Sequence, residues 1–259
     1  MRCIQRDHMI PFAGHTGTET FPVRTYDADS TGRAGIRAIA DYFQEAASGH
    51  ARTLGFPAER LRTEQLAWVL ARLQITVNRF PPAGETVTAV TWPAAHERHM
   101  AYRCYELYTQ DGELLAAGTS AWVTIHLADR SMVPLPDFIR DGYPQDNPPC
   151  RPFETRTLPR LREEAAGVRI RTRRADLDIN GHVNNGHYLQ WLLECMPCDR
   201  QNELRAVDIS FRAECFADTE IVSARGALTG EHTVLHCIRT ADDAKELCRA
   251  RSRWAAPLG

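Results

Sequence analysis

Residues 32–47, GRAGIRAIADYFQEAA, and residues 181–196, GHVNNGHYLQWLLECM, decide the fold of this 259-residue chain. When the two segments are laid on one another without a gap, Tyr42 aligns with Trp191. In each segment the apolar residues recur at the spacing of one helix face, and the Gly and Asx residues at its start suit turns and helix caps. We therefore expect two amphipathic helices, each of roughly four turns, at equivalent positions of an internal repeat.

The repeat continues into the segments that follow the helices. Residues 73–90, LQITVNRFPPAGETVTAV, align without a gap with residues 207–224, VDISFRAECFADTEIVSA. Both alternate apolar and polar residues, which is the period of a half-buried strand. Further on, two pairs of long strand-like segments around a short turn align, with Trp122 opposite Trp254. Each half of the chain thus predicts a strand, one helix and then three or more antiparallel strands.

A single long helix can bury its apolar face only by lying across the sheet, which must curl around it. The pattern therefore predicts an α+β fold of the tandem double hot-dog type, in which two curled antiparallel sheets each hold a central helix. We expect an N-terminal hot-dog unit at residues 1–126 and a C-terminal hot-dog unit at residues 168–259. Between them, residues 127–167 contain seven of the fifteen prolines, and this density predicts a connector.

The composition is that of an ordinary globular protein. Hydrophobic residues make up 43% of the chain and the formal net charge is −2, so nothing indicates binding to nucleic acid or to a membrane. No apolar run is long enough to span a bilayer, and the N-terminus lacks the apolar region of a signal peptide. Without secretory signals, the eight scattered cysteines are interpreted as reduced thiols rather than a disulfide framework. We expect a cytoplasmic protein.

Two motifs could in principle hold a metal, and neither has the usual ligand spacing. Cys195 and Cys198 form a CxxC, but no second pair accompanies it, and Pro197 more simply marks the end of a helix. His182 and His187 are five residues apart, whereas two ligands on one helix face lie four apart. We expect neither a metal nor a cofactor.

Ionisable groups are distributed unequally between the two halves. The second half has DLDINGH at residues 176–182, whereas the first half has DSTGR at residues 29–33, which lacks both His and Asn. Glu214 and Cys215 in the second half align with Phe80-Pro81 in the first. A purely structural repeat has no reason to concentrate its chemistry in one copy, so the second half is predicted to carry the site.

These segments resemble the signature of the acyl-acyl-carrier-protein thioesterases, a family that includes plant plastid enzymes and shorter bacterial relatives. The likeness extends from about residue 21 to residue 255. It implies hydrolysis of fatty acyl thioesters carried by acyl carrier protein. It also implies site residues that match the family motif, namely Asp178, Asn180, His182 and Glu214, with Cys215 at the position of a cysteine once proposed as the nucleophile.

Thioester hydrolysis needs an activated water and a polarised carbonyl, and the motif offers both. An imidazole beside a carboxylate transfers protons near neutral pH, and period-two spacing could direct Asp178, Asn180 and His182 to one side. The helix expected from about Val183 would present backbone N–H groups to the thioester oxygen. We favour Glu214 as the base, with Asp178 orienting His182 and Asn180, although the sequence leaves the choice of carboxylate open.

Each candidate also has a purely structural interpretation. Asp176, Asp178 and Asn180 could form Asx turns or cap a helix, and Cys215 could be a small core residue. Asn184 and Asn185 are assigned structural roles. Because neighbouring strand residues point to opposite faces, Glu214 and Cys215 should not both reach one carbonyl. We therefore favour a carboxylate-activated water over a cysteine nucleophile.

The first half is expected to supply the acyl pocket, with candidate linings at Ile36, Ile39, Ala40, Phe43, Trp68, Leu70 and Leu73. Arg171, Arg173 and Arg174 could contact the phosphopantetheine phosphate or an acidic carrier protein, or they could form a solvated strand face. The tandem copies would provide an internal pseudo-dimer, so the protein is expected to be a monomer or a homodimer.

Alternative functions remain open at this level. They are an acyl-CoA thioesterase, a hot-dog dehydratase acting on 3-hydroxyacyl thioesters, and a non-catalytic acyl-binding module. Acyl chain length and branching depend on packing that no motif reports.

Overall fold

A computed structural model describes residues 15–255 except 145, 198–203 and 231. It contains one eleven-stranded antiparallel sheet. The order of its main strands is β1 (Gly17–Pro22), β3 (Thr86–His96), β4 (Met100–Thr109), β5 (Leu114–His126), β2 (Leu66–Val77), β8 (Leu204–Phe211), β11 (Glu246–Trp254), β10 (Thr233–Thr240), β9 (Glu220–Arg225) and β7 (Ala166–Arg171). The short strand β6 (Met132–Val133) pairs with β5.

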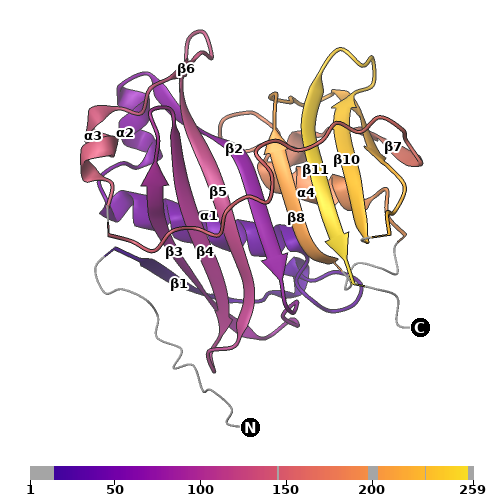
Figure 1. The fold of residues 1–259 in the computed structure, drawn as a ribbon, viewed down its shortest axis with the longest axis horizontal. Helices are drawn as coiled ribbons and strands as arrows, with labels where there is room; N and C mark the ends of the chain where they lie inside the picture. The colour runs from indigo at the N-terminus through magenta and orange to yellow at the C-terminus, as the bar shows by residue number, and fades with distance from the viewer. Residues whose placement is uncertain (1–14, 145, 198–203, 231, 256–259) are drawn as a thin grey trace.

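This strand order is the same when read inward from either end. From the outer edges, β1-β3-β4-β5-β2 of the first half matches β7-β9-β10-β11-β8 of the second, and β2 pairs with β8 at the centre. The helices α1 (Ile36–Thr53) and α4 (Asn185–Leu193) lie behind the sheet in Figure 1, one for each half. The structure is therefore the tandem double hot-dog that the sequence predicts.

The equivalence of the halves extends to individual hydrogen bonds. The indole N–H of Trp122 donates to Ser120 Oγ over 2.7 Å, and that of Trp254 donates to Ser252 Oγ over the same distance. The N–H of Ala34 donates to Pro81 O at 2.8 Å, as the N–H of Val183 does to Cys215 O at 2.9 Å. These paired bonds confirm the register of the alignment that places Trp122 opposite Trp254, and of the alignment of residues 73–90 with 207–224.

The two helices differ in length, which corrects the expectation of four turns each. The helix α1 has 18 residues, or five turns, and buries Ile39 and Phe43 completely. The helix α4 has nine residues. The two helices begin at equivalent residues, because the N–H of Asn184 donates to Asp176 O as that of Gly35 donates to Asp27 O. The difference lies at the other end, since α4 ends at Leu193 whereas α1 continues to Thr53. Asn184 caps α4 by accepting from the N–H of Gly186 at 2.8 Å, which confirms its structural role.

The two helices contact each other at Gly186. A Cβ at this position would lie 2.9 Å from Asp41 Oδ1 and 3.2 Å from Arg37 Cγ on α1. A larger residue here would force these two side chains of α1 to shift, so this glycine permits the close approach of the two helices.

The connector crosses the face of the sheet opposite the helices (Figure 1). It contains β6 and the short helix α3 (Asp137–Gly142), and further along it is held by side chains of the sheet. Trp92 Nε1 donates to Pro148 O at 2.9 Å, and Thr119 Oγ1 donates to Arg151 O at 2.8 Å. The strand β7 begins at Ala166, and the division of the chain at residues 127–167 stays a prediction.

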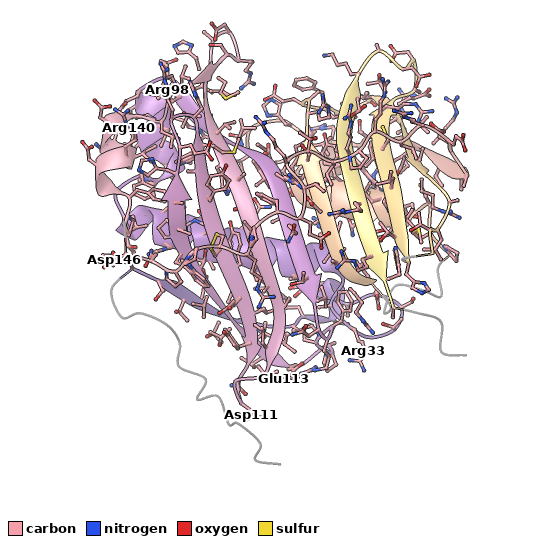
Figure 2. All side chains as sticks on the ribbon, in the orientation of Figure 1. Arg33, Arg98, Asp111, Glu113, Arg140 and Asp146 are labelled. Atoms are coloured by element: carbon pink, nitrogen blue, oxygen red, sulfur yellow. A yellow bond between two sulfur atoms is a disulfide. The ribbon has the colours of Figure 1, made fainter. Side chains whose placement is uncertain are left out.

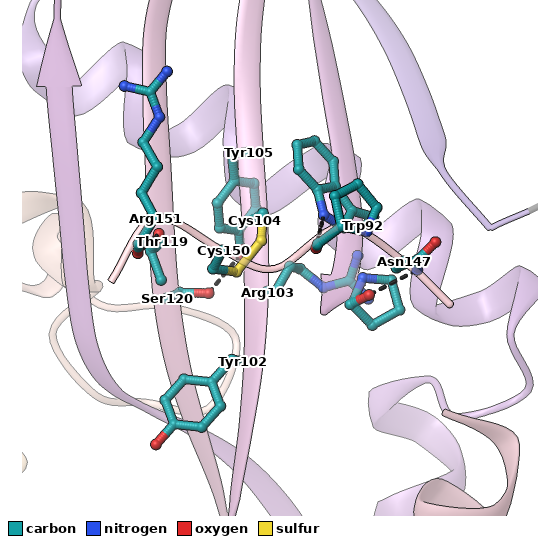
Figure 3. The surroundings of a disulfide bond; sticks show 12 residues. Trp92, Tyr102, Arg103, Cys104, Tyr105, Thr119, Ser120, Asn147, Cys150 and Arg151 are labelled. Carbon is teal, nitrogen blue, oxygen red and sulfur yellow. Dashed lines mark hydrogen bonds between the residues drawn. A yellow bond between two sulfur atoms is a disulfide. The ribbon is translucent and has the colours of Figure 1, made fainter. Parts of the chain in front are cut away.

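A disulfide joins Cys104 on β4 to Cys150 in the connector (Figure 3). The expectation that the cysteines are reduced thiols is therefore wrong for this pair. The two residues are 46 positions apart, and only the path of the connector over β4 brings them together. The free thiols of Cys195, Cys215, Cys237 and Cys248 are buried, whereas Cys3 and Cys198 lie outside the described residues.

An ion pair sits where the two halves of the sheet meet. Arg72 on β2 donates from Nε and Nη2 to the two carboxylate oxygens of Asp208 on β8, at 2.8 and 2.7 Å, and both side chains are almost fully buried. Arg72 Nη1 also donates to the carbonyls of Thr155 and Arg156, and its guanidinium stacks 4.3 Å from the ring of Phe153. One side chain thus binds both half-sheets and the connector.

The hairpins are closed by short turns. At the tip of the β4–β5 hairpin, Gly112 has a φ of +84°, between Asp111 and Glu113 at the lower edge in Figure 2. Among the described residues, no helix is long and apolar enough to cross a bilayer.

We predict that Arg72→Met lowers the free energy of unfolding by about 3–5 kcal/mol, because the Asp208 carboxylate then stays buried without its bidentate partner. Denaturant unfolding measures this loss. The double variant Arg72→Met/Asp208→Leu serves as the control and should recover most of the stability, since no buried charge is left. A loss below about 1 kcal/mol in the single variant would contradict the central role of the pair.

We also predict that Cys104→Ser/Cys150→Ser lowers the free energy of unfolding by about 2–4 kcal/mol, because the disulfide restricts a long loop in the unfolded chain. A thiol reductant should lower the melting temperature of the unaltered protein to that of the variant and leave the variant itself unchanged. Equal melting temperatures without reductant would show that the bond does not form.

Candidate active site

The motif residues 178–182 form a tight turn that opens the site. The N–H of Asp178 donates to His182 O at 2.7 Å, and the N–H of Gly181, whose φ is +79°, donates to Asp178 O at 3.1 Å. The Asp178 carboxylate accepts from the N–H groups of Asn180 and His182 at 2.8 and 3.2 Å. Asp178 is thus committed to its own turn, as in the structural interpretation of the motif.

The His182 imidazole lies between a carboxylate and a guanidinium. Its Nδ1 is 3.7 Å from Glu214 Oε1, and its Nε2 is 3.1 Å from Arg130 Nη2. Because a guanidinium can only donate, Nε2 accepts and a neutral imidazole carries its proton on Nδ1, toward Glu214. The imidazole and the Phe216 ring pack in a T-shaped arrangement, with their centroids 5.2 Å apart. The structure therefore brings together His182 and Glu214, two of the predicted residues.

Arg130 belongs to this site and was not predicted from the sequence. It follows β5 in the first half, its φ is +60°, and its Nε lies 3.6 Å from Glu214 Oε2. The neighbouring Asp129 accepts from the N–H and hydroxyl of Ser131, so the motif Asp-x-Ser could have indicated a turn here. Nothing in the sequence indicates that this turn faces the second half.

Cys215 is separated from the polar side of the site. It lies with Glu214 in a loop after β8 rather than on a strand, and its side chain packs in the hydrophobic core with 2% of the residue exposed. Burial raises the pKa of the Cys215 thiol, so the thiolate is disfavoured. The Glu214 side chain is about one-third exposed and faces His182. The expected opposition of the two residues holds, although a loop and not a strand produces it.

The start of α4 offers fewer free N–H groups than we expected. Those of Val183, Asn184, Gly186 and His187 donate to protein oxygens. Within the part of the chain that the structure describes, the N–H of Asn185 alone in this stretch has no acceptor. A single backbone donor, from a residue assigned only a structural role, is therefore left for a thioester oxygen at this helix end.

An apolar cavity of about 320 Å³ opens beside the motif turn. Ile179, which is 91% exposed, and Asn180 line its mouth, and the guanidinium of Arg62 donates to Asn180 Oδ1. Tyr143 of the connector also lines it, and the other lining residues come from the first half, namely Gln44, Ala47, Ser48 and Ala51 on α1, with Phe56, Ala58, Trp68, Ala101, Arg103 and Trp122. Asn180 thus faces the cavity, whereas His182 faces Glu214.

The first half supplies this cavity, but most of the predicted lining residues do not belong to it. Of the seven, Trp68 lines it and Ile36 lines a different hollow. Ile39, Ala40, Phe43, Leu70 and Leu73 pack in the core. The sequence pattern identified the face of α1 that contacts the sheet, whereas the cavity lies along the neighbouring face with Gln44, Ala47, Ser48 and Ala51.

The equivalent turn of the first half borders a different hollow, of about 360 Å³. It is lined by acidic and basic groups that include Asp29, Arg37 and Asp41. Arg33 takes the place of His182 and donates to Phe80 O at 2.9 Å, where the second half has Glu214. The described residues of this turn provide no imidazole–carboxylate pair, as the unequal motifs predict.

The cationic run before the motif is exposed, and part of it is already paired. Arg171 Nε lies 3.6 Å from Asp218, and Arg173 Nη2 donates to Asp176 at 2.9 Å. Burial of the Asp176 carboxyl would raise its pKa, but the hydrogen bonds from Arg173 and the nearby His187 lower it overall. Arg174 is exposed and carries no ion pair among the described residues.

Fold and site together define a double hot-dog protein with an imidazole and a carboxylate beside an apolar pocket, which is the arrangement of a thioester hydrolase. Two family models match the chain. The Acyl-ACP thioesterase N-terminal domain matches residues 14–143, and the Acyl-ACP thioesterase C-terminal domain matches residues 160–256. The chain belongs to the acyl-ACP thioesterase family, and its activity is the hydrolysis of fatty acyl-ACP.

Similar proteins include plant enzymes. Oleoyl-acyl carrier protein thioesterase 1 of Arabidopsis thaliana is 30% identical over 91% of this chain, which spans 75% of the length of that protein. A palmitoyl-acyl carrier protein thioesterase of Gossypium hirsutum is 28% identical over 92% of this chain, which spans 63% of its length.

Solved structures share the fold over almost their whole length. The 12:0-ACP thioesterase of Umbellularia californica superposes with a TM-score of 0.82 and 25% identity, covering 94% of this chain and 98% of that one. An acyl-ACP thioesterase of Bacteroides thetaiotaomicron gives a TM-score of 0.83 at 23% identity, covering 92% and 97%. The second likeness concerns the fold alone.

Proposed function

We propose that Glu214 activates a water molecule that attacks the thioester carbonyl, while the acyl chain lies in the cavity beside Asn180. The observation that carries this proposal is that Glu214 Oε1 lies 3.7 Å from His182 Nδ1. His182 belongs to the turn whose residues Ile179 and Asn180 line the cavity mouth. A carboxylate on the solvent side of the site can accept a proton from water, and the Nδ1–H of the adjacent imidazole orients that carboxylate.

In this mechanism Glu214 takes one proton of the water while the water oxygen bonds to the carbonyl carbon. The tetrahedral intermediate then collapses, the C–S bond breaks with its electron pair on sulfur, and the thiolate takes up the proton. The Asn180 amide at the cavity mouth and the N–H of Asn185 are the donors we assign to the carbonyl oxygen. Arg130 positions the pair by donating to His182 Nε2 and by lying beside Glu214.

Asp178 is assigned a positioning role, because its oxygens hold the turn from which Asn180 and His182 project. Cys215 is assigned to the core. A buried thiol with a raised pKa does not supply the thiolate that nucleophilic catalysis requires.

The partner is acyl carrier protein, and we propose that Arg174 and the partly paired Arg171 contact its acidic surface or the phosphopantetheine phosphate. A monomer with an internal pseudo-dimer, or a homodimer, remains our expectation. We also retain the cytoplasm as the proposed location. The carrier-bound substrate supports it, whereas the Cys104–Cys150 disulfide removes the argument from reduced thiols.

We predict that Glu214→Gln lowers kcat for acyl-ACP by about 10²-fold or more, because the amide cannot accept a proton from water. The matched control is Asp178→Asn, since Asn Oδ1 can accept the two backbone N–H bonds of the turn while the charge, and the bond from Asn180 Nδ2 to Asp178 Oδ2, are lost. It should retain most activity. A large loss of kcat in Asp178→Asn, with most activity retained in Glu214→Gln, would assign the base to Asp178.

Cys215→Ala in the same assay separates water attack from covalent catalysis. It should retain most activity. Complete loss, together with an acyl-enzyme detected by mass spectrometry of the unaltered protein, would establish a cysteine nucleophile and overturn the mechanism.

We predict that Ala47→Leu shifts the preference for saturated acyl chains toward shorter ones, by about tenfold in relative kcat/KM, because the added side chain occupies the cavity. Glu45→Leu is the control, since Glu45 is exposed on the same helix and does not line the cavity. An unchanged chain-length profile in Ala47→Leu would show that the acyl chain binds elsewhere.

A further inference from the structure

Arg103 places a cationic side chain in the wall of the proposed acyl pocket, where a hydrocarbon chain offers it no partner. It lies on β4, it is 6% exposed, and its side chain lines the cavity together with Trp68 and Trp122. Neighbouring positions of β4 place Cys104 on the opposite face, where it forms the disulfide with the connector (Figure 3). Arg103 therefore projects to the inner side of the sheet, toward α1.

The protein leaves this charge without a counterion. Arg103 Nη1 contacts His50 Nδ1 at 3.1 Å and donates to Thr91 Oγ1 at 3.2 Å. Burial and the adjacent guanidinium lower the pKa of His50 to about 4, so this neighbour is neutral. No carboxylate of the described residues lies within ion-pairing distance of Arg103. A buried charge without a partner is costly and is seldom kept without a role.

The remaining donors of Arg103 belong to a side chain that lines the cavity. Its Nε and Nη2 donate to no acceptor in the described part of the chain, and the cavity is the space that the side chain lines. On the facing wall, Gln44 and Ser48 add two more polar side chains among the alanines of α1. A plain hydrocarbon chain bound here would leave these donors without acceptors.

We propose that this pocket selects acyl chains carrying an oxygen function beyond the thioester, which accepts hydrogen bonds from the Arg103 guanidinium. A hydroxyl, an oxo group and a terminal carboxylate share the required chemistry. The inference rests on the proposed function in one respect, namely that the acyl chain occupies this cavity. Because a site built to hydrogen-bond a substrate group discriminates strongly against analogues that lack it, the effect belongs to specificity and not to the hydrolytic step.

The test compares acyl-ACP substrates of equal chain length that are unsubstituted, hydroxylated, oxo-substituted or ω-carboxylated. For the unaltered protein, kcat/KM for at least one oxygen-bearing chain should exceed that of the unsubstituted chain by about tenfold or more. A gain confined to the ω-carboxylate identifies an ion pair, and an equal gain for the neutral groups identifies a hydrogen bond. An unsubstituted chain preferred over all three overturns the proposal.

Variants then assign the preference to Arg103. Arg103→Met and Arg103→Gln should bring the ratio of the two kcat/KM values close to one. The control is Arg98→Met. Arg98 is exposed in the turn between β3 and β4 (Figure 2), so this variant should keep the kcat/KM ratio of the unaltered protein. A ratio that persists in folded Arg103 variants assigns the selectivity elsewhere and overturns the proposal.

The ratio in the unaltered protein decides the matter even if both Arg103 variants unfold. Failure of the underlying function looks different. If Ala47→Leu leaves the chain-length profile unchanged while the oxygen-bearing substrates still show a preference, the acyl chain does not occupy the cavity. The oxygen preference then does not arise from Arg103, and the Arg103 variants should keep the kcat/KM ratio of the unaltered protein.

Discussion

The pairing of β2 with β8, held by the buried contact between Arg72 and Asp208, is the constraint on which the rest of the structure depends. It makes one continuous sheet from two halves that could each curl around a helix alone. Because the strand order is symmetric about this seam, α1 and α4 meet behind the sheet, at Gly186. The same guanidinium holds the connector, so the path that links the halves is anchored where they join.

The seam explains why a single site is shared between two halves. The second half contributes His182 and Glu214, the first half contributes most of the cavity wall, and the start of the connector contributes Arg130. Neither half has both the reactive groups and the apolar pocket. At the equivalent position Arg33 donates to Phe80 O, so among the described residues this turn has no imidazole–carboxylate pair. The two hollows differ accordingly, since most residues that line the cavity beside Asn180 are apolar, whereas several acidic groups line the other hollow.

Prediction from the sequence succeeded where the property is local or periodic. The alignment of Trp122 with Trp254 is confirmed by identical indole bonds, and the alternation of residues 73–90 and 207–224 places four strands in register. It failed where chain path decides. Cys104 and Cys150 meet only because the connector crosses β4, and α4 ends at Leu193 whereas its counterpart α1 continues to Thr53. The residues of α1 that line the pocket lie next to those that pack in the core, and hydrophobic periodicity does not separate two adjacent helix faces.

The sequence by itself determined the repeat, the fold class and the family, and it locates the motif with His182 and Glu214 in the second half. These follow from hydrophobic period and from residue identity, which act within one segment. Only the tertiary structure decided that Asp178 serves its own turn, that Cys215 packs in the core, and that Arg130 and Arg103 face the site and its pocket. The physical reason is that these roles depend on distances between segments far apart in the chain, which are set by how two sheets join.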